Sequence, residues 1–137
     1  MTKYVEWYRH AERFGFVTIA NDSFVRLVGS IEDDKMVKIA QELGANVPKQ
    51  LTLFWFKKSD LDKLLELISL FGKYSGSQKC EIERDGENII LVLRHNLGEK
   101  WSLFLKNFLG EAIKTVTGKP TQCELVNQAV FFRFPAH

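Results

Sequence analysis

The segment from Arg94 to Ser102 holds the side chains best suited to binding or acid–base chemistry. It reads as a strand end, a glycine-containing turn and the start of a helix, which would bring His95, Asn96 and free backbone amides together. Amides at a helix N-terminus favour an anion. We therefore predict that this turn forms the polar lip of a small-molecule pocket between a helix and a sheet. The candidate ligand-binding residues are Arg94, His95, Asn96, Trp101 and Ser102.

A structural interpretation of the same segment stays open. In it, Asn96 or Gly98 caps the helix, Trp101 packs in the core and His95 hydrogen-bonds a backbone carbonyl. His95 would act as a general base only with an orienting carboxylate and a reactive partner. The nearest acid, Glu99, is expected on the solvent side of the helix, so we assign no catalytic residue.

The rest of the sequence carries no motif that demands chemistry. The phosphate-binding patterns GxGxxG and GxxxxGK[ST] are absent, and so are GxSxG and HExxH. The His and Cys residues stand at positions 10, 80, 95, 123 and 137, without the close-spaced pairs of a zinc site. We expect no metal and no cofactor.

The composition is that of an ordinary globular domain. Of 137 residues, 45% are hydrophobic and 26% charged, which excludes a disordered or low-complexity chain. Nineteen basic and seventeen acidic residues give a formal charge of +2, without the basic excess of phosphate-binding proteins. Lys57 and Lys58 lie near Trp55, as in basic–aromatic nucleic-acid patches, but Asp60 and Asp62 follow at once. We expect no direct nucleic-acid binding by this chain.

Two further absences bear on location. The start, MTKYVEWYRH, has no apolar run, and no stretch approaches the ~20 consecutive apolar residues that span a bilayer. We expect neither a signal peptide nor a membrane partner. Cys80 and Cys123 read as buried strand residues rather than nucleophiles. These features predict a cytoplasmic protein with reduced thiols.

Aromatic residues are the one compositional oddity. Eleven Phe, three Trp and three Tyr make up 12% of the chain, which suits a Phe-rich core, or rings that line a ligand pocket or a subunit interface. Residues 3–14 are expected to form a short helix with an aromatic stripe on one face and Glu6, Arg9, His10 and Arg13 on the other. Such a helix is marginal alone, so its stripe must dock on this chain or on a second copy. The candidate dimer interface is Tyr4, Trp7, Tyr8, Ala11 and Phe14.

The first half of the chain is predicted to be mostly helical. Helices are expected after the cap clusters at residues 21–23 and 32–34, the second of them ending at Gly44. Leu51–Phe56 is too short for periodicity to separate strand from helix, and its aromatic content favours a strand. Residues 59–74 contain a cap and then a helix that is apolar around nearly two thirds of its circumference. Such a helix is buried on two sides.

The second half changes period. Asp85-Gly86 is a strong hairpin signal between two strands, and a long helix with an apolar stripe from Trp101 to Val116 follows. We predict a single α+β domain over residues 1–137: a mostly helical part, 4–74, and then a β-β-α-β-β part, 78–134, whose antiparallel sheet is covered by one long helix. The expected strands are Lys79–Arg84, Asn88–Arg94, Cys123–Val126 and Ala129–Phe134.

Three stretches, Tyr4-Val-Glu-Trp7, Arg13-Phe-Gly-Phe16-Val17 and Leu93 to Phe104, resemble a group of uncharacterised archaeal proteins, chiefly from ammonia-oxidising lineages. In that group a ribbon-helix-helix DNA-binding segment commonly precedes the YVEW-type helix. The resemblance implies a regulator-like architecture with a C-terminal dimerising or sensing domain, and no known site. Only Met1-Thr2-Lys3 precede Tyr4 here, so base readout is not carried over to this chain.

A weaker resemblance is to the β-β-α-β-β cores of vinyl-reductase-type and haem or nitric-oxide sensing domains, in which a helix and two hairpins close over a small ligand. It lies in the order of elements and in the region of His95 and Trp101. We transfer no haem ligand from it.

These observations favour a non-enzymatic regulatory module, a homodimer that senses a small apolar ligand as part of a transcription-regulator-like protein. The alternative is a small enzyme, or a haem or small-ligand sensor, that uses the Arg94–Ser102 turn. A nucleic-acid-binding module is the third hypothesis, and the even charge balance weighs against it.

Overall fold

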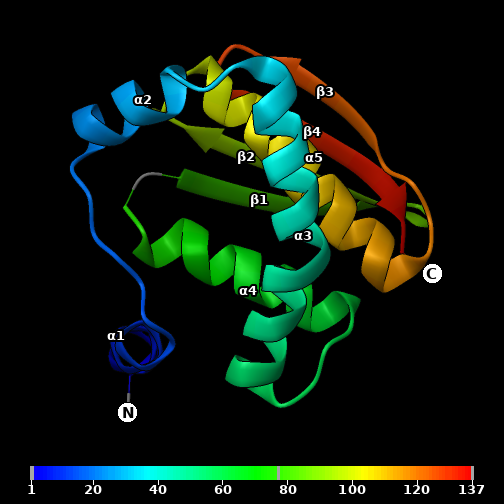
Figure 1. Cartoon of the computed structure of the whole chain (residues 1–137). Coiled ribbons are helices and arrows are strands. Elements are labelled where there is room, and N and C mark those ends of the chain that lie inside the picture. The colour runs from blue at the N-terminus through cyan, green and yellow to red at the C-terminus, as the bar shows by residue number, and fades with distance from the viewer. Residues whose placement is uncertain (1, 77, 137) are drawn as a thin grey trace.

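A computed structural model describes residues 2–76 and 78–136 of the chain, and the elements below lie within those ranges (Figure 1). Their order confirms the predicted α+β class, with a helical N-terminal half followed by strands and one more helix. The helices are α1 (Lys3–Phe14), α2 (Asn21–Gly29), α3 (Asp33–Phe56), α4 (Leu61–Tyr74) and α5 (Glu99–Thr117). The strands are β1 (Gln78–Asp85), β2 (Asn88–His95), β3 (Gln122–Val126) and β4 (Ala129–Pro135).

The four strands form one antiparallel sheet in the order β1-β2-β4-β3. Two hairpins, β1–β2 and β3–β4, supply the outer and inner strand of each half, as their turn residues predict. Gly86, with a φ of 63°, and Asn127, with a φ of 53°, take the left-handed conformations that these tight turns require. Each edge strand therefore pairs with its neighbour along the chain, and only β2–β4 is a long-range pairing.

The core lies between one face of this sheet and the helices α4 and α5 (Figure 1). The central strands β2 and β4 contribute Leu91, Val130 and Phe132, which are almost completely buried. Helix α5 covers the sheet as expected, and α4 lies beside it, packed on β1. Helix α3 packs on the outer side of α5 and forms a third layer.

Helix α3 is longer than the sequence predicts. It neither ends at Gly44 nor gives way to a strand at Leu51–Phe56, but runs unbroken through Pro48 to Phe56. Both expectations were wrong for one reason: this helix packs along α5, and tertiary packing overrides local propensity. Gly44 is needed for that packing, since a Cβ at this position would lie 2.2 Å from the carbonyl oxygen of Phe108.

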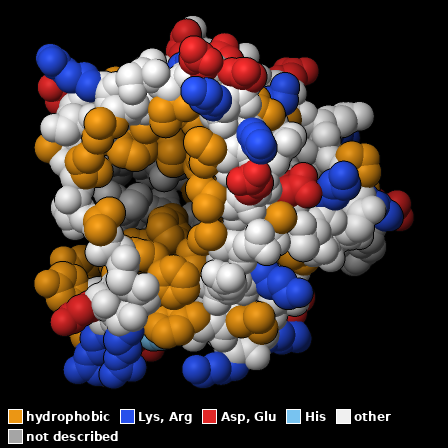
Figure 2. All heavy atoms as spheres, in the orientation of Figure 1, with side chains coloured by type: hydrophobic (Ala, Val, Ile, Leu, Met, Phe, Trp, Pro, Cys, Tyr) orange, Lys and Arg blue, Asp and Glu red, His pale blue; other side chains and the backbone are white. Residues whose placement is uncertain are grey.

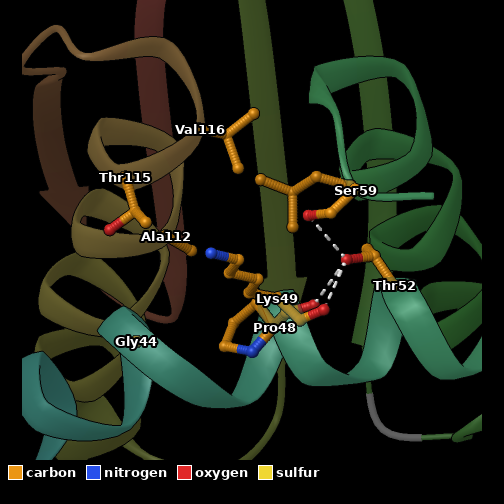
Figure 3. A pocket seen from close by; sticks show the side chains of 9 residues that line it. Gly44, Pro48, Lys49, Thr52, Ser59, Ala112, Thr115 and Val116 are labelled. Carbon is orange, nitrogen blue, oxygen red and sulfur yellow. Dashed lines mark hydrogen bonds between the residues drawn. The ribbon is translucent and has the colours of Figure 1, made fainter.

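The backbone around Pro48 is supported by a buried hydroxyl. Thr52 lies one turn further along α3, with its Oγ1 3.0 Å from the carbonyl oxygen of Pro48, 2.9 Å from that of Lys49 and 3.0 Å from Ser59 Oγ (Figure 3). The hydroxyl can donate to one of the two carbonyls and accept from Ser59. It thereby ties the helix to the connection that leads into α4.

Residues 3–29 form an arm along one side of these layers (Figure 1). Helix α1 packs against α3 and α4, and α2 packs against α5. The extended residues 15–20 connect the two helices, with the ring of Phe16 packed on Trp7 and Phe71. Helix α1 contains no buried residue. The arm is therefore attached to the rest of the chain at its two ends, by half-buried side chains.

Candidate apolar ligand cavity

The arm and the three layers enclose an open cavity of about 1010 Å³ between them. Figure 2 shows the hollow, with hydrophobic side chains around its opening and along its wall. Ligand pockets usually have volumes of about 300–1,000 Å³ and are mostly apolar, so this cavity is at the upper end of that range. It draws its lining from all five helices and from the linker at residues 15–20.

Helix α5 builds one wall from stacked rings. Trp101 and Phe104 stack with their centroids 4.4 Å apart, and Phe104 stacks on Phe108 at 5.1 Å. The spacing of three and four residues places the three rings on one face of the helix. Phe24 of α2 meets Trp101 edge-to-face at 4.9 Å, which anchors the arm to this wall.

Helix α4 supplies the facing surface. Because it is apolar on two sides, it packs Leu65 into the core by the sheet and still directs Leu67 and Phe71 to the cavity. Phe71 meets Trp7 of α1 at 4.8 Å and Phe16 of the linker at 5.4 Å. This ring cluster anchors the other end of the arm.

The lining is rich in aromatic groups and poor in charge. Among the described residues that line it, two are Trp, two Tyr and six Phe. Glu12 of α1 is the single charged side chain there, with no Lys, Arg or His in the same lining. Such a surface can hold an apolar molecule by burial and ring contacts. Its groups capable of proton transfer, among the described lining residues, are the Glu12 carboxylate and the hydroxyls of Tyr8 and Tyr74.

His95 and Ser102 are both buried and are hydrogen-bonded to each other, outside this lining. The Leu97 amide donates to His95 Nδ1 at 3.1 Å, so the ring proton is on Nε2. Nε2 then donates to Ser102 Oγ at 2.8 Å, and that hydroxyl donates to the carbonyl of Asn127 at 3.3 Å. With this tautomer His95 cannot accept the serine proton, so the pair is not a nucleophile and its base. Burial lowers the pKa of His95, which favours the same neutral ring.

The other predicted ligand-binding residues are separated. Arg94 lies on the exposed face of the sheet, where its guanidinium donates to Glu81 at 2.8 Å. The side-chain oxygen of Asn96 accepts a hydrogen bond from the side-chain amide of Asn21 at 2.9 Å, at the N-terminus of α2. Trp101 is the one member of the predicted set that lines the cavity. Its buried indole N–H has no acceptor among the residues that the structure describes.

The predicted dimer face of α1 is divided. Trp7 and Phe14 contact rings of their own chain, and Ala11 is half-buried and lines the cavity. Tyr4 and Tyr8 remain about 60% exposed, at 59% and 63%. His10, placed on the polar face by its sequence spacing, instead stacks on Trp55 at 4.5 Å.

The two cysteines and the basic–aromatic patch near Trp55 are engaged in packing or ion pairs within the protein. Burial raises the pKa of the Cys80 and Cys123 thiols to about 11, so neither is a ready nucleophile near neutral pH. Lys58 pairs with Asp60 at 3.1 Å, and Trp55 belongs to the ring cluster around Trp7. Within the described ranges, no three His, Cys, Asp or Glu side chains gather as metal ligands, and no helix is long and apolar enough to cross a membrane.

Sequence reasoning missed most of the cavity. Leu43 and Val47 of α3 and Thr18 and Ile19 of the linker line it, and nothing in their local sequence marks them. Two general signals pointed toward it: the excess of aromatic residues, and the helix at 61–74 with two apolar sides. The recess between α3 and α5 in Figure 3, around Pro48 and Thr52, has no room for a ligand.

Comparisons with protein-family models, with curated proteins and with solved structures give no match to this chain.

Proposed function

We propose that this protein is a non-enzymatic binding module that holds a small apolar molecule in the cavity between the arm and helices α3, α4 and α5. The cavity of about 1010 Å³, with its ten aromatic side chains, is the observation that supports the proposal. Apolar surface left open to water costs roughly 25 cal/mol per Å², so an occupant that covers it gains free energy.

The arm gives such a module a means of response. A ligand in the cavity would contact the arm on one side and α4 and α5 on the other, so its binding would fix the arm against the layers. The linker favours this role, since Val17 is 91% exposed and no residue of α1 is buried. The resemblance of the Tyr4–Trp7 and Leu93–Phe104 stretches to regulator-like proteins agrees with a sensing function.

The test is a titration with the neutral fluorescent probe N-phenyl-1-naphthylamine. We expect saturable binding, and about fivefold weaker binding by Leu43→Gln, because a polar amide replaces part of the apolar wall. Ile39→Gln is the matched control, since Ile39 lies one turn earlier on α3, is 42% exposed against 40% for Leu43, and does not line the cavity. Absence of saturable binding, or an equal loss in both variants, would overturn the proposal.

Dimerisation through α1 is a second proposal, favoured by the exposed rings of Tyr4 and Tyr8. A stable interface buries about 1,600 Å² in total, so other parts of the arm would have to take part. Light scattering of the native chain should then give twice 15.8 kDa, and Tyr8→Ala should lower it. A monomeric native protein, or a Tyr8→Ala variant that keeps the dimer mass, contradicts dimerisation through this face.

A further inference from the structure

Among the described residues that line the cavity, the single charged one is an acid. Glu12 lies on α1 at the rim of the cavity and is exposed to solvent. No ion pair or hydrogen bond to its carboxylate occurs among the described residues. The apolar interior therefore has a free negative charge at its mouth and no positive charge among its described lining residues.

Tyr8 lies one helical turn before Glu12, and both line the cavity. A tyrosine ring attracts a cation placed over its face, and the attraction adds to that of a neighbouring carboxylate. Rings of this chain already receive cations in this way, as Lys63 Nζ lies 5.0 Å from the centroid of Phe56. The rim is thus suited to a positive group whose apolar body extends inward.

Resting on the proposed function, we propose that the cavity selects hydrophobic cations: molecules with an aromatic or aliphatic body and a single ammonium-type group, which binds at Glu12 and Tyr8. A neutral molecule of the same shape would gain only the burial of its body. A carboxylate of the same shape would meet Glu12 and find no cation in the described lining to balance its charge.

Three probes with one aromatic body test this inference: 1-naphthylmethylamine, which is cationic at pH 7.5, neutral 1-naphthalenemethanol and anionic 1-naphthoate. Calorimetry at low ionic strength should rank their affinities in that order, with about tenfold between the cation and the anion. Glu12→Gln should weaken the amine by about three- to fivefold and leave the alcohol unchanged, as expected for a partly exposed ion pair. Glu6→Gln is the matched control, because it removes the same charge from the same helix at a position outside the cavity lining.

The outcomes separate the two proposals. If the alcohol binds but the amine binds no better, or if Glu12→Gln and Glu6→Gln weaken the amine equally, selectivity for cations is overturned and the apolar cavity still binds ligand. If none of the three probes binds, both proposals fail.

Discussion

His95 Nε2 lies 2.8 Å from Ser102 Oγ, and this buried hydrogen bond joins the end of β2 to the first turns of α5. Two further bonds extend the junction to the β3–β4 turn, because Ser102 donates to the Asn127 carbonyl and the His95 amide donates to the Gln128 carbonyl at 3.0 Å. The segment that most resembles a reactive site in the sequence therefore holds a sheet, a helix and a turn together. Ser102 directly follows the cavity-lining Trp101, so the junction holds the end of α5 that carries this ring.

A neutral, buried His95 makes the stability of the fold depend on pH. Burial lowers its pKa from the ordinary value of 6.5, so below that pH the unfolded chain binds a proton that the folded chain resists. We expect the free energy of unfolding to fall as pH drops from about 7 through the lowered folded-state pKa, and then to stop responding to this group. Urea titrations between pH 7.5 and 5, compared with those of His95→Asn, should show this fall in the native protein alone.

Ser102→Ala tests the same junction without removing the imidazole. It leaves the Nε2 proton of His95 buried without an acceptor, which costs about 1–3 kcal/mol. Urea unfolding at pH 7.5 measures the loss. If Ser102→Ala is as stable as the native chain, the bond between His95 and Ser102 does not contribute to stability. For the preceding prediction, a pH dependence of stability that is unchanged in His95→Asn would assign that dependence to another group.

Gly44→Ala should destabilise the protein by about 2–3 kcal/mol or more. The added Cβ would meet the Phe108 carbonyl oxygen at 2.2 Å and its carbon at 3.0 Å, both backbone atoms, so α3 and α5 would have to separate. Gly29→Ala is the control within a helix, because a Cβ there meets nothing within 4 Å and alanine favours the helical state. Thermal unfolding of both variants checks this, and equal melting temperatures would contradict the close approach.

Trp7→Ala should release the arm without unfolding the sheet. Trp7 meets Phe16, Trp55, Phe71 and Tyr74 at ring distances of 4.8–5.9 Å, so truncation removes the main contact of α1. We expect about 1–3 kcal/mol less protection from hydrogen exchange in residues 3–14, and little change in β2 and β4. Glu6→Ala, at an exposed position of the same helix that does not line the cavity, should leave protection unchanged. An equal loss in both variants would contradict docking through Trp7.

The second half of the chain could be predicted because its signals are local. Asp85-Gly86 fixes one hairpin, and the 3/4 spacing from Trp101 to Val116 fixes α5. The continuation of α3 to Phe56 could not be predicted, because Gly44 and Pro48 are helix breakers by local propensity. Their tolerance depends on α5 and on Thr52, which lie close only after folding.

The site was predictable only in part, for a similar reason. Of the predicted binding residues, Trp101 lines the cavity, whereas the polar residues predicted with it form hydrogen bonds within the protein. The cavity depends on where an extended linker and a distant helix place Phe16 and Phe71, and no sequence spacing encodes that arrangement. The exposed charge of Glu12 looked like any other helix-surface charge in the sequence.

The most direct measurement is a methyl NMR spectrum recorded while neutral 1-naphthalenemethanol is titrated into the native chain. Val47 and Leu67 line the cavity. Leu91 and Val130 are buried residues of the sheet that do not line it. We expect saturable shifts at Val47 and Leu67, and much smaller changes at Leu91 and Val130. Unchanged spectra, or shifts confined to Ile90 and Val92 on the opposite face of the sheet, would contradict a ligand-binding cavity between the arm and the helices.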